Sequence, residues 1–163
     1  MSAPARRLAV GSDMRHATAD AVVAHLEVCG CSVVRCGAVG GGEDTPWPSV
    51  AEAVARLVAQ GAVDQGVLCC WTGTGVAMAA NKVPGVRAAL CGDAVTAAGA
   101  RRWNDANVLA LSLRATSAAV ADEIIDAWLS AGDVDPSEAA NVAAVATIER
   151  RYRERATAAA TAE

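Results

Sequence analysis

A cysteine, two threonines and two glycines stand close together in residues 70–75, where they could carry out proton-transfer chemistry. The apolar run over residues 65–70 predicts a buried strand, and residues 74–82 favour a helix. A strand, a tight glycine turn and a helix N-terminus present backbone N–H groups to a ligand. The partial positive charge of that N-terminus favours the thiolate of Cys70. We therefore expect Cys70 to act as a nucleophile or a base.

The turn after Cys70 adds donors for a negatively charged oxygen. The amides of Gly73, Thr74 and Gly75 can hold a developing oxyanion, and the Thr72 hydroxyl adds another donor. Glycine turns of this kind are common between strands and helices, so the turn alone is weakly informative. No Gly-Lys-Ser/Thr of a Walker loop follows, and the full G-x-G-x-x-G motif is missing, which weakens a nucleotide-binding interpretation.

Asp13 follows the first predicted strand and is expected at the same edge of the sheet as Cys70. A carboxylate there caps a helix about as often as it serves a site, so both roles stay open. The segment 103–107 (Trp-Asn-Asp-Ala-Asn) also has a purely structural interpretation, as a polar loop between a helix and a strand that is anchored by its tryptophan.

The hydrophobic pattern predicts strands alternating with helices. Strands are expected over residues 7–11, 31–36, 65–70, 86–91 and 108–113. Helices are expected over residues 17–29, 49–60 (capped by Ser49), 74–82, 93–103, 117–130 and 137–155. This alternation is typical of an α/β fold with a parallel sheet covered on both faces. We expect one domain over residues 1–163, with a core over residues 7–132 and the last helix as a subunit contact.

Composition and charge narrow the classes of partner. A net charge of −4 and a pI near 5.2 argue against nucleic-acid binding, which usually requires a basic protein surface. We expect no membrane association, because no apolar run is long enough to cross a bilayer. The N-terminus lacks a signal-peptide core, so the cytoplasm is the expected location.

Six cysteines without a signal peptide argue against a disulfide scaffold. Cys29, Cys31 and Cys36 have no zinc-like partner pair, and His16 and His25 do not complete one, so no metal site is predicted. Cys69 and Cys70 are adjacent in a strand and must face opposite ways. For every cysteine except Cys70, a role as a small buried hydrophobe is the better expectation.

Several ordered motifs resemble the family of ribose-5-phosphate isomerase B and galactose-6-phosphate isomerase. The motifs are residues 70–75, 79–89 and 104–110, together with residues 11–13 and 124–129, and the resemblance spans residues 7–155. It implies a Rossmann-like three-layer α/β/α sandwich with a five-stranded parallel sheet. It also implies a homo-oligomer, dimer or tetramer, with shared active sites. The implied reaction is aldose–ketose isomerisation of a sugar or sugar phosphate through a cis-enediolate, without metal or cofactor.

The resemblance also assigns roles to residues. It places the base that moves a proton between C1 and C2 at Cys70, and the family's catalytic threonine at Thr72. The enediolate-binding amides correspond to residues 73–75, and the sugar contacts to Asp13 and Asn104. Trp71, in the same turn, is expected to line the substrate.

Four positions depart from the family pattern. Met14 stands where the family has a phosphate-contacting histidine, and Trp103 where it has the histidine that opens the sugar ring. Ser137 and Asn141 stand where two arginines clamp the phosphate, which leaves Arg114 as the anion contact from that set. A phosphate without these partners loses several charge-assisted hydrogen bonds. Trp103 is instead expected to stack on the sugar.

Three hypotheses follow from this mixture of retained and altered residues. The first is an isomerase whose substrate is not ribose 5-phosphate but an unphosphorylated, acidic or short acyclic sugar. The second is a sugar-phosphate isomerase with a rearranged phosphate site, in which Arg15 or His16 contacts the phosphate. Residues of these types at the start of a helix are more often exposed side chains that bind no ligand. The third is a non-catalytic sugar-binding subunit.

Overall fold

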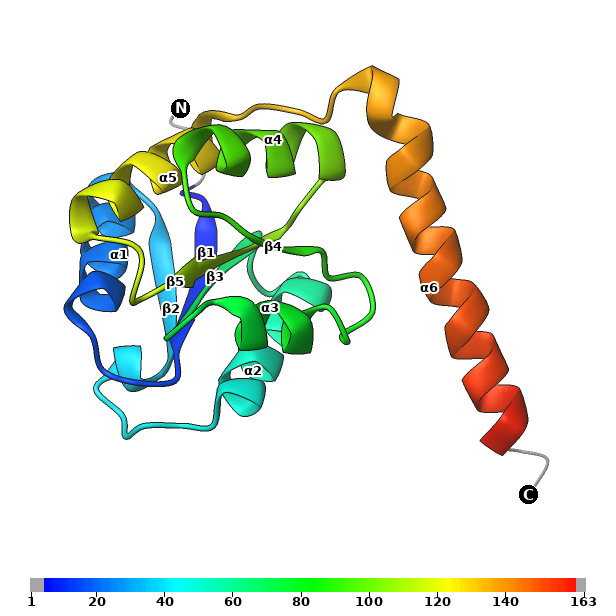
Figure 1. The fold of residues 1–163 in the computed structure, drawn as a ribbon, viewed down its shortest axis with the longest axis horizontal. Helices are drawn as coiled ribbons and strands as arrows, with labels where there is room; N and C mark the ends of the chain where they lie inside the picture. The colour runs from blue at the N-terminus through cyan, green and yellow to red at the C-terminus, as the bar shows by residue number, and fades with distance from the viewer. Residues whose placement is uncertain (1–4, 161–163) are drawn as a thin grey trace.

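A computed structural model describes residues 5–160 of the chain as a five-stranded parallel sheet with helices around it (Figure 1). The strands are β1 (Arg7–Ser12), β2 (Ser32–Gly37), β3 (Gln65–Cys70), β4 (Ala88–Leu90) and β5 (Val108–Ser112). They lie in the order β2-β1-β3-β5-β4, so β3 is central and β4 is an edge strand. The predicted α/β fold is confirmed, although β4 is shorter than the expected 86–91.

Helices cover both faces of the sheet. One face carries α1 (Ala17–Val28), α4 (Ala94–Asn104) and α5 (Ala118–Ser130), and the other carries α2 (Trp47–Ala59) and α3 (Thr74–Ala80). A separate hydrophobic cluster fills each of the two layers between sheet and helices. This arrangement is the expected three-layer sandwich.

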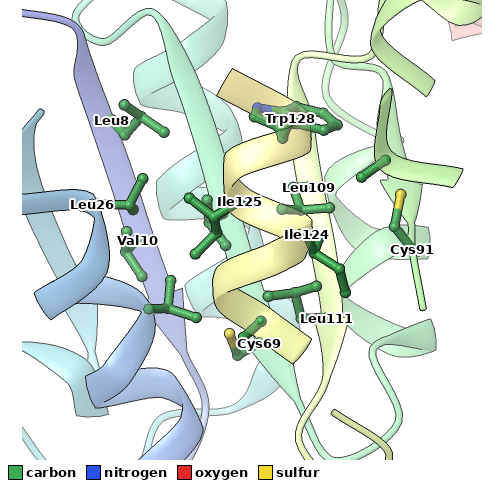
Figure 2. Packing of buried hydrophobic residues seen from close by; sticks show 14 of the residues in the cluster. Leu8, Val10, Leu26, Cys69, Cys91, Leu109, Leu111, Ile124, Ile125 and Trp128 are labelled. Carbon is green, nitrogen blue, oxygen red and sulfur yellow. The ribbon is translucent and has the colours of Figure 1, made fainter. Parts of the chain in front are cut away.

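The larger cluster packs α5 on the central strands. Figure 2 shows Ile124, Ile125 and Trp128 of α5 over the sheet, with the Cys69 side chain in the same layer. The Trp128 indole N–H donates to the Gln65 side chain at 2.9 Å, so this buried polar pair is satisfied. Cys70 belongs to the opposite layer, as the two-residue period of a strand requires.

The start of α2 differs from the prediction. Ser49 was expected to cap this helix, but α2 begins at Trp47 with Pro46 at the N-cap position. The Ser49 N–H donates to the Pro46 carbonyl at 2.9 Å, which places Ser49 inside the first turn. Pro48 fits there because first-turn N–H groups have no intrahelical partner.

The last helix stands apart from the sheet and its covering helices (Figure 1). A 3₁₀ turn over Pro136–Glu138 leads into α6 (Ala139–Ala160), which extends beyond the predicted end at residue 155. None of its residues is buried. A carboxylate of α6, Glu149, accepts the Gly85 N–H through both oxygens at 3.1 Å. Within residues 5–160, no helix is both long and apolar enough to cross a membrane.

Candidate active site

Three neighbouring strands end together at one edge of the sheet and bring predicted site residues to it. Ser12 of β1 pairs with Cys69 of β3, and Cys70 pairs with Ser112 of β5. The loops that follow therefore place Asp13, Cys70 and Arg114 at the same carboxyl edge. The Arg114 N–H donates to the Trp71 carbonyl at 3.1 Å, which ties the two central loops together.

Cys70 is the thiol that this edge presents to the turn. Its side chain is 5 % exposed, and its Sγ accepts the Gly73 N–H at 3.2 Å. A hydrogen bond donated to sulfur stabilises a thiolate more than a thiol. Cys69 faces the other way, where burial, together with the nearby Cys70 and Asp13, raises its pKa to about 12. The adjacent thiols are therefore not interchangeable as bases.

The turn after Cys70 requires glycine at position 73. Gly73 has φ of 75°, and a Cβ there would lie 2.9 Å from the Leu111 carbonyl carbon and 2.5 Å from Leu90 Cδ1. The turn is thus pressed against β5. It leads into α3, where the first-turn N–H groups of Thr74 and Gly75 have no intrahelical acceptor. The Thr72 and Thr74 hydroxyls lie 2.7 Å apart and form a polar pair beside these amides.

The Trp47 side chain packs against this turn, although Trp47 lies before the helix predicted over residues 49–60 and was assigned no role. A Cβ at Gly75 would lie 3.1 Å from the Trp47 ring, so the indole packs directly against the glycine backbone. Trp47 and Trp71 both remain partly open to solvent, at 43 % and 51 % exposure. An aromatic residue that opens a helix at the carboxyl edge is the signal that could have identified Trp47.

Asp13 does not act as the helix cap that was its alternative role. His16 caps α1, and its Nδ1 accepts the Thr18 N–H at 3.1 Å. The Asp13 Oδ1 is buried and has no hydrogen-bond partner among residues 5–160. Burial raises the pKa of the Asp13 carboxyl, the Asp44 charge adds to this shift, and the backbone N–H groups of Asp13 and Met14 oppose it. A buried acceptor without a donor is suited to a ligand hydroxyl.

Two predicted site residues lie at the opposite edge of the sheet. Trp103 and Asn104 end α4 and precede the start of β5 at Val108, whereas Cys70 pairs with the last residue of that strand. Asn104 lines a groove of about 720 Å³ beside α6, and a Cβ at Gly99 would lie 2.5 Å from the Trp103 ring. One copy of the chain therefore does not bring Asn104 to Cys70.

Arg15 and His16, which were considered as compensating phosphate contacts, are engaged locally. Arg15 donates to the carbonyls of Gly41 and Gly42 at 3.4 and 3.2 Å. His16 is occupied as a helix cap, and Met14 packs against the hydrophobic cluster.

The two clamp positions near α6 are also satisfied by neighbours. Ser137 donates to the Asp135 carboxylate through both its N–H and its hydroxyl, and Asn141 donates to Glu138 at 2.8 Å. Arg114 is exposed, and its guanidinium makes no hydrogen bond or ion pair with residues 5–160. It is a cation at the carboxyl edge that remains free for an anionic group.

A family model, curated relatives and solved structures all relate this chain to sugar isomerases. The model of the Ribose/Galactose Isomerase family matches residues 8–148. Ribose-5-phosphate isomerase B of Escherichia coli K12 is 41 % identical over 130 residues, 80 % of this chain and 87 % of that protein. D-erythrulose-4-phosphate isomerase of Pectobacterium atrosepticum is 44 % identical over 90 residues, 55 % of this chain and 59 % of that protein. The structure of Clostridium thermocellum ribose-5-phosphate isomerase B superposes with a TM-score of 0.83 at 36 % identity, covering 90 % of this chain and 99 % of that one.

The packing of Gly73 on β5 predicts a large cost for Gly73→Ala. Gly30→Ala is the matched control, because Gly30 has φ of 80° but a Cβ added there would meet nothing within 4 Å. Both changes should lower the free energy of unfolding by about 1–2 kcal/mol, because alanine is strained in the left-handed backbone conformation. Gly73→Ala adds a steric overlap that costs about 1–3 kcal/mol more. Urea denaturation followed by circular dichroism measures both, and equal losses would contradict the close packing of this turn.

Proposed function

This chain belongs to the ribose/galactose isomerase family, and on that premise we propose that it is an aldose–ketose isomerase in which Cys70 moves the proton. We further propose that its substrate is an open-chain sugar other than ribose 5-phosphate. The observation that carries the first part is the Gly73 N–H donating to Cys70 Sγ at the start of an amide-lined turn. That contact supports a thiolate beside the groups that would hold an enediolate.

The proposed reaction transfers one proton between adjacent carbons. The Cys70 thiolate takes the proton from the hydroxyl-bearing carbon next to the carbonyl, and the carbonyl oxygen gains the negative charge. The N–H groups of Thr74 and Gly75 stabilise that oxygen. The Cys70 thiol then returns the proton to the former carbonyl carbon on the same face, which completes the isomerisation.

The oxygen-bound proton must move in the same direction, from the hydroxyl oxygen to the former carbonyl oxygen. The hydroxyl pair of Thr72 and Thr74, 2.7 Å apart, offers a donor and an acceptor for that transfer. The unpaired Oδ1 of Asp13 is suited to accept a hydrogen bond from a substrate hydroxyl and so to orient the sugar. Trp47 and Trp71 would form the walls of the site.

The substrate proposal rests on the missing ring-opening group. Trp103 has no acid–base function, so a cyclic sugar would have no catalyst for opening its ring. A four-carbon sugar 4-phosphate cannot close a five-membered ring, because the oxygen required for closure is esterified. A relative with 44 % identity is named a D-erythrulose-4-phosphate isomerase. We therefore place a four-carbon sugar 4-phosphate first among the open-chain substrates.

The altered phosphate positions fit a shorter substrate. In a four-carbon sugar the phosphate is one carbon closer to the reacting carbons than in a five-carbon sugar. A clamp at Ser137 and Asn141 would then lie beyond its reach. Arg114, at the carboxyl edge and free of other partners among residues 5–160, is the cation placed to pair with it.

A complete site requires a second copy of the chain in this proposal. Asn104 lies at the edge opposite Cys70, so it can contact the sugar only if a partner subunit presents it. The apolar side chains Val145, Ile148 and Tyr152 of α6 are more than half exposed, which suits a helix that packs on another subunit. We propose a homo-oligomer with shared sites, in which α6 is part of the contact.

Cys70→Ala should abolish isomerisation. General-base catalysis contributes about 10²–10⁴-fold, so a loss of at least that size is expected, measured as deuterium exchange at the substrate carbon in heavy water. Cys69→Ala is the matched control, because Cys69 is adjacent in sequence but faces the other layer. Exchange that survives in Cys70→Ala would show that another group is the base.

A substrate panel separates the remaining hypotheses. We expect kcat/KM for D-erythrulose 4-phosphate to exceed that for ribose 5-phosphate by at least about 100-fold. This ratio corresponds to a difference of roughly 3 kcal/mol in transition-state binding. Full activity on ribose 5-phosphate would instead favour a rearranged phosphate site. Binding of sugars by calorimetry without turnover of any would favour a non-catalytic subunit.

Shared sites predict recovery of activity on mixing two inactive variants. Cys70→Ala and Asn104→Ala should each be inactive alone. In hybrid dimers one of the two sites would combine both intact residues, so about a quarter of all sites should recover after co-refolding an equal mixture. A mixture that stays as inactive as its components would show that Cys70 and Asn104 do not act together across subunits.

A further inference from the structure

A second cluster of reactive side chains lies on the helical layer, away from the carboxyl edge. His25 near the end of α1, Cys29 at its C-cap and Asp126 of α5 place one nitrogen, one sulfur and one oxygen within 4.8 Å of one another. No step of the proposed isomerisation uses these residues. Together they carry the three donor types found around protein-bound zinc.

The helices themselves bring this set together. His25 and Cys29 are four residues apart, and the Cys29 N–H donates to the His25 carbonyl at 2.9 Å, which keeps the helical turn intact to that point. Their side chains therefore share one face of α1. Helix α5 packs beside α1 (Figure 1) and presents Asp122 and Asp126, again four residues apart. No metal site was predicted from the sequence because Asp126 lies about a hundred residues from the other two donors.

The distances suit one small cation. Cys29 Sγ lies 3.8 Å from Asp126 Oδ1, close to the ligand separation that tetrahedral zinc bond lengths of about 2.0–2.3 Å require. His25 Nε2 lies 2.7 Å from the same oxygen, which is a hydrogen-bond distance, so these two side chains would move apart as a cation replaced the proton between them. The other ring nitrogen, Nδ1, faces Asp122 Oδ1 at 3.6 Å. A carboxylate behind a histidine is the usual arrangement that orients a zinc ligand.

The charges around Cys29 also favour a cation over a plain ion pair. The Cys29 thiol is exposed and donates to Asp126 Oδ1 at 3.8 Å, and Asp122 adds a second carboxylate beside His25. Asp122 Oδ1 is buried without a hydrogen-bond donor among residues 5–160. No lysine or arginine of that part of the chain pairs with Asp122 or Asp126. The nitrogen, sulfur and carboxylate oxygens of this cluster are all groups that bind a divalent cation.

We propose that His25, Cys29 and Asp126 bind Zn²⁺, with water completing a tetrahedron and Asp122 orienting the histidine. On binding, the Cys29 thiol releases its proton to solvent, and neutral His25 binds through Nε2 while its proton moves to Nδ1, toward Asp122. The ion would fasten the end of α1 to α5. It lies away from the carboxyl edge that holds Cys70, and none of its residues is assigned to isomerisation, so it is independent of the proposed function.

Cobalt substitution of the purified full chain tests the site. One equivalent of Co²⁺ should give the thiolate-to-cobalt charge-transfer band and the intense visible bands of a tetrahedral site, and one equivalent of Zn²⁺ should remove them. Cys29→Ser should lose the charge-transfer band, and Cys36→Ser, a thiol outside the cluster, should keep it. Asp122→Asn should weaken Zn²⁺ binding about 10–100-fold in competition with a chelating dye.

Three results would overturn the proposal: no charge-transfer band in the parent chain, a band that persists in Cys29→Ser, or a band that is lost in Cys36→Ser. The stabilising effect proposed for Zn²⁺ can be measured separately as a change in unfolding temperature. Zn²⁺ should raise the unfolding temperature of the parent chain and have no such effect on Asp126→Asn. Isomerase activity should stay unchanged in Asp126→Asn, which keeps this outcome distinct from failure of the proposed function.

Discussion

The parallel pairing of β3 between β1 and β5 is the constraint on which the rest of the structure depends. Because the three strands end together, the loops after them meet at one edge. The two-residue period of β3 then assigns its last two cysteines to opposite layers. Close contact of Gly73 with the backbone of β5 holds the following turn, so that its N–H points at Cys70. The role proposed for Cys70 therefore depends on backbone packing more than on any charged neighbour.

Much of this arrangement could be predicted because it follows from local patterns. Alternating apolar runs and helical periods identify the α/β fold, and a thiol between a strand and a glycine turn indicates the candidate site. The start of α2 escaped because two prolines move the first turn ahead of Ser49. Trp47 and the cluster around Asp126 escaped because they depend on contacts between distant segments. Contacts between distant segments produce no hydrophobic periodicity that could be detected in a single sequence.

The site combines retained geometry at one end with altered chemistry at the other. Cys70, Asp13 and the amide turn are positioned by the sheet. Two of the four positions expected to differ from the family pattern, Ser137 and Asn141, lie just before and in α6, a helix without buried residues. Residues on such a helix can change with little effect on the fold, because they take no part in the core. A family of this architecture can therefore keep one proton-transfer step while its substrate changes.

If the proposed sites are shared between subunits, the separation of Asn104 from Cys70 across the sheet has a kinetic consequence. A chain that needs a neighbour to complete its site has a turnover number only while it is assembled. On dilution below the dissociation constant of the assembly, activity per chain would fall in proportion to the remaining complex, and substrate that bridges two copies would slow that fall. Enzyme concentration then becomes a control on flux in its own right.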